Sequence, residues 1–96
     1  MISKKEIIKR IEDNKYKIKK FRVKKIGLFG SYLKNKQTKK SDIDFLVEFE
    51  KVTADNFFEL LFFLEKIFRK KIDLVDNNFM RKELKYVKDE AEYVEI

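Results

Sequence analysis

The sequence contains no cysteine, no histidine and only two glycines among its 96 residues. Without cysteine the chain can form neither disulfides nor thiolate metal sites. Without histidine it cannot use Ser-His or Cys-His nucleophile pairs, imidazole general bases or histidine metal ligands. Gly27 and Gly30 are too few for a dinucleotide-binding GxGxxG motif, a Walker-type phosphate loop or a kinase glycine-rich loop. Any chemistry must therefore depend on carboxylates, hydroxyls, lysines, arginines and a metal ion that such groups could bind.

Long hydrophobic segments are also missing. The longest unbroken apolar run covers residues 60–64, whereas a membrane-spanning helix needs about 20 apolar residues. Residues 1–15 contain no apolar stretch of the kind found in secretory signals. We therefore expect one domain over residues 1–96 that is soluble and cytoplasmic and has no association with a membrane.

Charge is distributed unevenly along the chain, whose net charge is +7. Residues 1–40 carry 15 lysines and arginines against three acids, whereas residues 41–96 carry nine against 14. A basic segment is most often a solvated surface, but it can also attract nucleic acid or the triphosphate of a nucleotide. Direct nucleic-acid binding is the less favoured alternative, because the aromatic residues fall mostly at expected core positions and no RNA-binding motif occurs.

The hydrophobic pattern predicts helices alternating with strands. A Ser3–Glu6 capping box begins the first helix, Thr53 caps a middle helix, and Asn77 or Asn78 caps the last one. The expected order is a helix from residue 3 to about 20, a strand over 21–29, a helical turn and loop over 32–41, a strand over 43–49, the middle helix, a strand over 72–75, the last helix with Met80, Leu84, Val87 and Ala91 on one side, and a strand over 93–96. This order predicts an α/β or α+β domain, with a small mixed sheet and helices packed mainly on one face.

The middle helix has an apolar face wider than a single stripe. Phe57 and Leu64 follow helical spacing, and Phe58, Phe62 and Phe63 extend the face beyond it. Both sides of this helix can be buried within the monomer, or the outer part can meet a partner protein. The sequence supports these two interpretations equally.

Two acidic residues alternate with apolar residues at the start of the second expected strand. Asp42 and Asp44 are two positions apart, so their carboxylates point to the same face of the sheet. Like charges this close repel, and a divalent cation relieves the repulsion. Oxygen ligands without histidine or cysteine favour Mg²⁺ or Mn²⁺ over Zn²⁺. The ordinary alternative is a turn stabilised by aspartate side chains.

A third acid, Asp73, lies in the apolar strand expected over residues 72–75. An acid there costs free energy unless it is paired or binds a metal ion. If its strand lies beside that of Asp44, three carboxylates converge and suit a two-metal site for phosphoryl transfer. Asp73 could instead form an ion pair with Lys71 or Lys24.

A glycine and a serine end the first expected strand. Gly30 lets the backbone approach a phosphate closely, and Ser31 offers a hydroxyl and a free N–H group. Four lysines would then surround the phosphates with positive charge: Lys34, Lys36, Lys39 and Lys40. Gly-Ser is by itself a common turn dipeptide, but together with the three acids in this order it predicts a site for a nucleotide and a metal ion.

These segments resemble a known signature. Residues 26–31 (IGLFGS) and 41–47 (SDIDFLV) resemble that of the minimal nucleotidyltransferases, in the DNA polymerase beta-like superfamily, and residues 71–75 (KIDLV) match the strand that carries its third acid. The resemblance covers about residues 21–96. It implies a palm-like fold, two Mg²⁺ ions held by Asp42, Asp44 and Asp73, and ATP as the nucleotide. It also implies that Asp73 helps to activate the attacking hydroxyl and that Gly30 and Ser31 hold the triphosphate.

The same resemblance implies a partner. The family is similar to the antitoxin of a two-gene module whose toxin is a helical HEPN-domain protein, typically a ribonuclease. It implies that the antitoxin transfers AMP to a tyrosine hydroxyl of this toxin and also binds it. The alternative is an antitoxin that neutralises its partner by complex formation with little or no catalysis.

The sequence departs from the family pattern at four positions. The family usually has Arg-x-Arg-Gly after the Gly-Ser pair, whereas residues 32–35 read Tyr-Leu-Lys-Asn. Lys34 keeps a positive charge but lacks the forked geometry of arginine. Asn35 can replace glycine because asparagine tolerates a left-handed backbone. Arg69 stands where a glycine often ends the middle helix.

Overall fold

The computed structural model describes residues 2–96 and contains a four-stranded mixed sheet. The elements are, in order, α1 (Lys4–Asp13), α2 (Lys15–Lys19), β1 (Val23–Phe29), α3 (Gly30–Leu33), β2 (Ile43–Phe49), α4 (Ala54–Phe68), β3 (Ile72–Asp76), the 3-10 turns η1 (Asn77–Phe79) and η2 (Lys82–Leu84), α5 (Lys85–Glu90) and β4 (Glu92–Glu95). The strand order is β3-β2-β1-β4, in which β2 and β3 are parallel and the other pairs antiparallel. The predicted mixed α/β fold class is confirmed.

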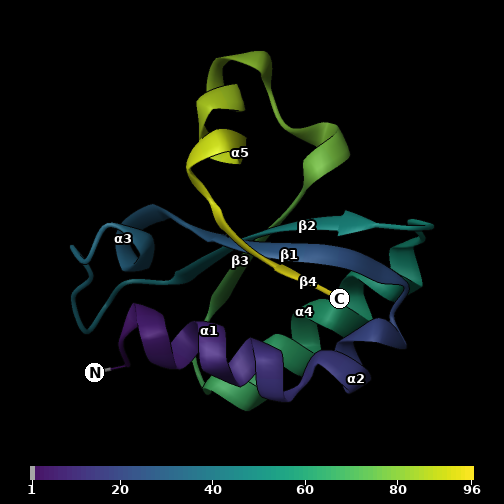
Figure 1. The fold of residues 1–96 in the computed structure, drawn as a ribbon, viewed down its shortest axis with the longest axis horizontal. Coiled ribbons are helices and arrows are strands. Elements are labelled where there is room, and N and C mark those ends of the chain that lie inside the picture. Colours follow the sequence, from purple (N-terminus) through teal and green to yellow (C-terminus); the bar gives the residue numbers. More distant parts are fainter. Residues whose placement is uncertain (1) are drawn as a thin grey trace.

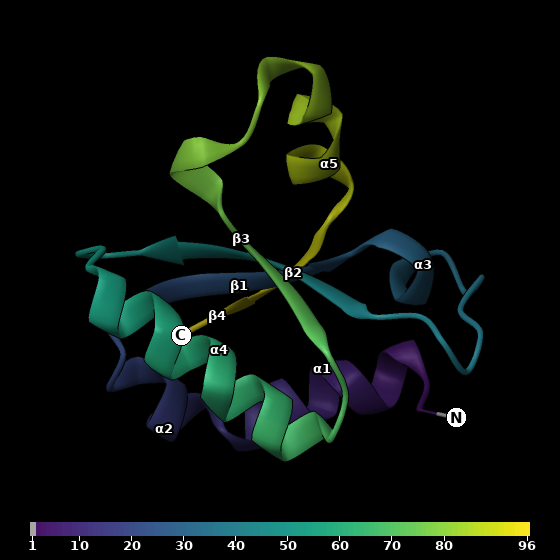
Figure 2. The same cartoon turned by 180° about the vertical axis from the view of Figure 1, so that it is seen from behind.

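The two faces of the sheet are covered differently. Helices α1, α2 and α4 lie along one face, and η1, η2 and α5 stand on the opposite side (Figures 1 and 2). Alternate residues of β2 point to opposite faces, so the buried Ile43, Phe45 and Val47 point toward the helices and form a core with them. Asp44 therefore points to the other face, where the site can form. No helix within residues 2–96 is long and apolar enough to cross a membrane.

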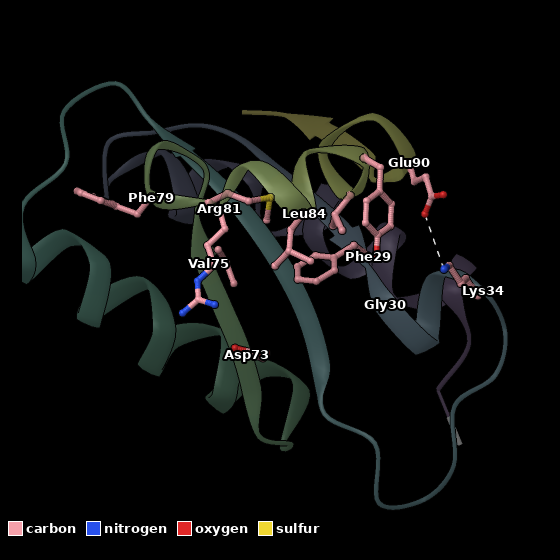
Figure 3. Close-up of a pocket in the computed structure, with 12 residues that line it drawn as sticks. Phe29, Gly30, Lys34, Asp73, Val75, Phe79, Arg81, Leu84 and Glu90 are labelled. Carbon is pink, nitrogen blue, oxygen red and sulfur yellow. Dashed lines mark ion pairs between the residues drawn. The ribbon is translucent and has the colours of Figure 1, made fainter.

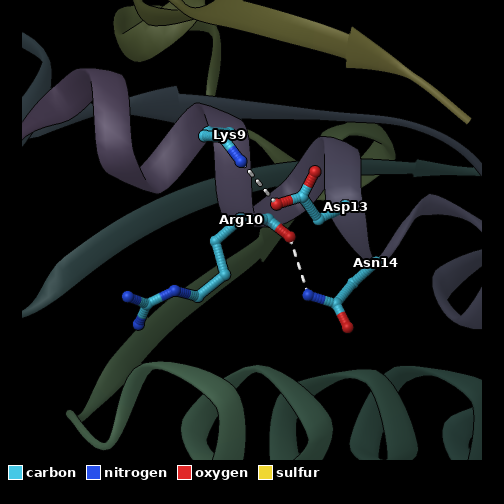
Figure 4. A network of polar contacts seen from close by, with 4 residues as sticks. All are labelled: Lys9, Arg10, Asp13 and Asn14. Atoms are coloured by element: carbon cyan, nitrogen blue, oxygen red, sulfur yellow. Dashed lines mark hydrogen bonds and ion pairs between the residues drawn. The ribbon is translucent and has the colours of Figure 1, made fainter.

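The first expected helix is divided in two. Asn14 ends α1, and its side-chain amide donates a hydrogen bond to the Arg10 carbonyl oxygen at 2.8 Å (Figure 4). An ion pair between Lys9 and Asp13 lies on the same helix, at 3.1 Å (Figure 4). The Arg10 guanidinium donates to the Ile67 carbonyl oxygen at 3.2 Å, which fixes α1 against α4. The prediction of one helix to residue 20 is wrong because Asn14 satisfies the end of α1 locally.

The middle helix begins as predicted. The Thr53 hydroxyl accepts a hydrogen bond from the Asn56 N–H at 3.0 Å. Phe57 and Phe63 are half-buried against the core. Phe58 and Phe62, however, are 51% and 62% exposed. The wide apolar face is thus divided between core and surface. Part of it is buried within the monomer, and part is exposed and could meet a partner protein.

The last helix is much shorter than expected. The Asp76 carboxylate, rather than an asparagine, accepts from the Asn78 N–H at 2.9 Å and begins the 3-10 turn η1. Met80 and Arg81 then have extended backbones, and η2 and the six-residue α5 follow. Consecutive asparagines favour local turns over helix, which explains why the prediction of a helix from Asn77 or Asn78 is wrong.

Candidate active site

Two acids from neighbouring strands meet on the face of the sheet opposite the core. Asp44 in β2 and Asp73 in β3 are register partners in the parallel pair, so their side chains point the same way. Burial, the charge of Asp73 with a hydrogen bond shared with it, and the charge of Asp42 raise the pKa of Asp44 from 3.8 to about 6. The close approach of these carboxylates is therefore unfavourable when both are ionised and no cation is present.

This pair has the chemistry of a magnesium site. Among residues 2–96, no three acidic side chains are gathered closely enough to hold an ion by themselves. The structure thus brings Asp44 and Asp73 together, and Asp42 contributes to the local field from the position just before β2. Mg²⁺ in nucleotide sites usually binds one or two carboxylates, and water and phosphate oxygens complete its coordination. Two repelling carboxylates with only oxygen donors fit that arrangement.

The alternative ion pairs of Asp73 do not form. Lys24 pairs with Glu48 at 3.4 Å, and neither Lys24 nor Lys71 forms an ion pair with Asp73 in the described part of the chain. Asp73 is instead exposed on the sheet face beside Asp44. Its carboxylate is therefore available to a ligand.

Gly30 adjoins the acidic pair because its neighbour Phe29 is the register partner of Asp44. Its φ is +74°, in the left-handed region that favours glycine. A Cβ atom at this position would overlap Oδ2 of Asp44 and would lie 2.9 Å from its Cγ. A glycine is therefore required here for the backbone to pass the carboxylate.

A pocket of about 430 Å³ opens beside Gly30 and Asp73 (Figure 3). Asp73 lines it from β3 and Gly30 from the start of α3, and apolar side chains of Met80, Leu84 and Val87 line it from the opposite segment. The volume and the mixture of apolar walls with a few polar groups are typical of small-ligand sites.

The predicted phosphate-binding residues are placed unequally. Lys34 lines the pocket, and its Nζ lies 3.8 Å from Oε2 of Glu90 on α5 (Figure 3). Ser31 follows Gly30 directly in α3, and Lys40 belongs to the loop before β2; neither is among the residues that line this pocket. Asn35 has the predicted left-handed backbone, with φ of 58°.

Sequence reasoning missed the segment that closes the pocket. The spacing of Met80, Leu84 and Val87 was a correct signal of a common apolar side, but these residues face the pocket and not the core. Arg81 lines the pocket from the same segment. Arg81 could not be identified as a site residue from the sequence, because nothing in its sequence context distinguishes it from the other basic residues.

Residues 4–95 match the family model described as the nucleotidyltransferase domain. A Methanocaldococcus jannaschii protein named provisionally as a protein adenylyltransferase is 53% identical over 58 residues, which are 58% of this chain and 58% of that protein. Protein adenylyltransferase MntA of Thermococcus cleftensis is 40% identical over 57 residues, again 58% of each chain. The match thus spans less than two thirds of the length of these relatives.

Solved structures share the architecture. One, of a protein described provisionally as a minimal nucleotidyltransferase, is 24% identical and has a TM-score of 0.81, with 95% of both chains covered. Another, described as a toxin-antitoxin with AMP-PNP, is 30% identical and has a TM-score of 0.61 over 86% of this chain and 64% of that chain. The first similarity concerns the fold alone, and the second adds a moderately similar sequence.

Proposed function

The chain belongs to the nucleotidyltransferase domain family, and on that premise we propose that it transfers AMP from ATP to a hydroxyl group. The observation that supports this most directly is the Asp44–Asp73 pair beside Gly30, next to a pocket that Asp73 and Gly30 line. Paired carboxylates next to a glycine turn are the groups that a metal-bound triphosphate requires. The similarity to proteins named adenylyltransferases supports AMP as the transferred group.

The residues of the site have distinct proposed roles. Asp42, Asp44 and Asp73 hold Mg²⁺ together with phosphate and water oxygens, and the bound ion neutralises charge on the phosphates and on the departing pyrophosphate. Gly30 and Ser31 bind the triphosphate through their backbone, and Lys34 and Lys40 add positive charge. Asp73 orients the acceptor hydroxyl and takes its proton. The apolar side chains of Met80, Leu84 and Val87 limit the access of water, which would otherwise compete as an acceptor.

We also propose that the acceptor is a tyrosine of a HEPN-type toxin and that the chain acts as its antitoxin. The similarity to a solved toxin-antitoxin with AMP-PNP supports this partner and this nucleotide. The second candidate function is neutralisation by complex formation alone. It is favoured by the exposed Phe58 and Phe62, an aromatic surface of the kind that protein partners cover.

The test is transfer of label from α-labelled ATP with Mg²⁺ to a co-expressed HEPN-domain protein. Asp44→Asn should abolish labelling and preserve the fold, because the substitution is nearly isosteric and removes one carboxylate of the pair. Asp55→Asn, an exposed position on α4, is the matched control and should transfer at the wild-type rate. If Asp44→Asn leaves the labelling unchanged, the proposed AMP transfer at this site is refuted. Neutralisation that survives in this variant without labelling would support complex formation.

A further inference from the structure

Two cationic residues line the pocket, at opposite ends of it. Lys34 follows the turn at Gly30, and Arg81 lies between η1 and η2 on the segment that faces the sheet (Figure 3). They are 47 positions apart in the chain, and the fold alone brings them to one cavity. Their surroundings differ.

Lys34 is already engaged with an acid, and Arg81 is not. The Lys34 ammonium lies 3.8 Å from the Glu90 carboxylate. Within residues 2–96 the Arg81 guanidinium takes part in no ion pair, and the residue is exposed. Its backbone is fixed, since its carbonyl oxygen accepts from the Leu84 N–H at 3.0 Å at the start of η2. The side chain therefore presents free donors from a defined position.

The guanidinium lies on the Asp73 side of the pocket (Figure 3). In the proposed reaction the acceptor hydroxyl is held by Asp73, so the phosphorus that it attacks must lie near this residue. A guanidinium has five N–H donors in a planar fork that matches two phosphate oxygens, which the point charge of Lys34 cannot do. Arg81, which has the forked geometry, thus lies at the Asp73 end of the pocket, where the reaction is proposed to occur. Lys34 lies at the opposite end.

From this placement we infer that Arg81 is a catalytic residue, which binds the non-bridging oxygens of the α-phosphoryl group during transfer. The acceptor oxygen forms the new bond to the α-phosphorus, and its proton passes to Asp73. The bond from the α-phosphorus to the bridging oxygen breaks, and its electron pair leaves with pyrophosphate. Arg81 stabilises the negative charge on the phosphoryl oxygens throughout this exchange. The inference rests on the proposed AMP transfer and assigns to it a residue that the family motif does not contain.

Three variants test this role: Arg81→Ala, Arg81→Lys and, as the matched control, Lys82→Ala. Lys82 is the next residue, is exposed and does not line the pocket. With α-labelled ATP, Mg²⁺ and the HEPN-domain acceptor, Arg81→Ala should lower kcat about 10²-fold or more, with a smaller rise in the KM for ATP. Arg81→Lys should retain an intermediate rate. Guanidinium chloride at millimolar concentration should partly restore Arg81→Ala and leave Lys82→Ala unaffected.

Nucleotide binding gives a readout that needs no acceptor. Calorimetry with α,β-methylene ATP and Mg²⁺ should show about tenfold weaker binding by Arg81→Ala than by Lys82→Ala, since a charged hydrogen-bonding pair is lost. If the wild type transfers AMP and Arg81→Ala matches it in rate and affinity, the role of Arg81 is refuted and the proposed function stands. If the wild type neither transfers AMP nor binds the analogue, the proposed function itself is refuted, and the role of Arg81 with it.

Discussion

At the scale of single residues, Asp44 links stability to pH. Its pKa is raised to about 6 by burial and by the carboxylates of Asp73 and Asp42. Between pH 4 and 6 the folded chain therefore binds more protons at this group than the unfolded chain, so stability falls as pH rises through this range. In EDTA, Asp44→Asn should be more stable than the wild type by about 1 kcal/mol at pH 7.5, a value discounted for the solvent that screens a half-buried carboxyl.

Urea unfolding at pH 4, 5 and 7.5 measures this effect. The advantage of Asp44→Asn should be largely lost at pH 4, where the wild-type carboxyl is protonated in the folded state and nearly half protonated in the unfolded state. Mg²⁺ at pH 7.5 should stabilise the wild type and have little effect on the variant. A variant less stable than the wild type at pH 7.5 in EDTA would show that repulsion at this site is not the dominant effect.

Single residues were predictable where a local rule decided them. The alternation of side chains along β2 turns Asp44 away from the core, and the tolerance of asparagine for a left-handed backbone gives Asn35 its conformation. Arg81 could not be found in this way, because its place in the pocket depends on the path of a whole segment. The close approach of the Gly30 backbone to the Asp44 carboxylate likewise depends on tertiary structure, since it joins the start of α3 to β2.

At the scale of elements, the end of α4 carries a strained residue. Arg69 has φ of 53°, and its N–H donates to the Glu65 carbonyl oxygen at 2.8 Å. A left-handed conformation costs a residue with a side chain about 1 kcal/mol, and glycine adopts it freely. Arg69→Gly should therefore raise the free energy of unfolding by about 0.5–1 kcal/mol.

Lys66→Gly is the matched control, because Lys66 is an exposed residue of the same last turn but lies inside the helix. It should lower the free energy of unfolding by about 1 kcal/mol. Urea titrations of both variants measure the two effects. Equal destabilisation by both glycines would mean that the left-handed backbone at Arg69 is not a source of strain.

Elements with a strong pattern and a cap were predictable, and those with a weak pattern were not. In strand β2 every second residue is apolar, with Asp44 and Glu48 between them and Leu46 as the one further apolar residue, and Thr53 caps α4 as expected. The segment over residues 77–91 has apolar spacing but begins with two asparagines, so turn formation at Asp76 prevails over a continuous helix. Helical spacing shows only that side chains share a side, and here that side lines a pocket.

At the scale of the whole molecule, the sheet separates the basic residues into two groups. The lysines of α2 lie in the helical layer, on the face of the sheet away from the pocket (Figure 1). The lysines of residues 34–40 follow α3, whose first residue, Gly30, lines the pocket. The two groups contribute equally to the net charge. Because salt screens the attraction between exposed charges, only lysines close to a phosphate should strengthen its binding.

Two triple variants with the same change in charge distinguish local attraction from general attraction. Lys36, Lys39 and Lys40 are replaced by glutamine in one, and Lys17, Lys19 and Lys20 in the other; all six are exposed. At 50 mM NaCl the loop variant should bind Mg²⁺ and ATP roughly three- to tenfold more weakly than the wild type, and the α2 variant should be nearly unchanged. At 300 mM NaCl the loop effect should shrink, because screening weakens interactions between exposed charges. Calorimetry at both salt concentrations measures this difference, and equal losses in the two variants would show that the basic half attracts anions without a defined place for the triphosphate.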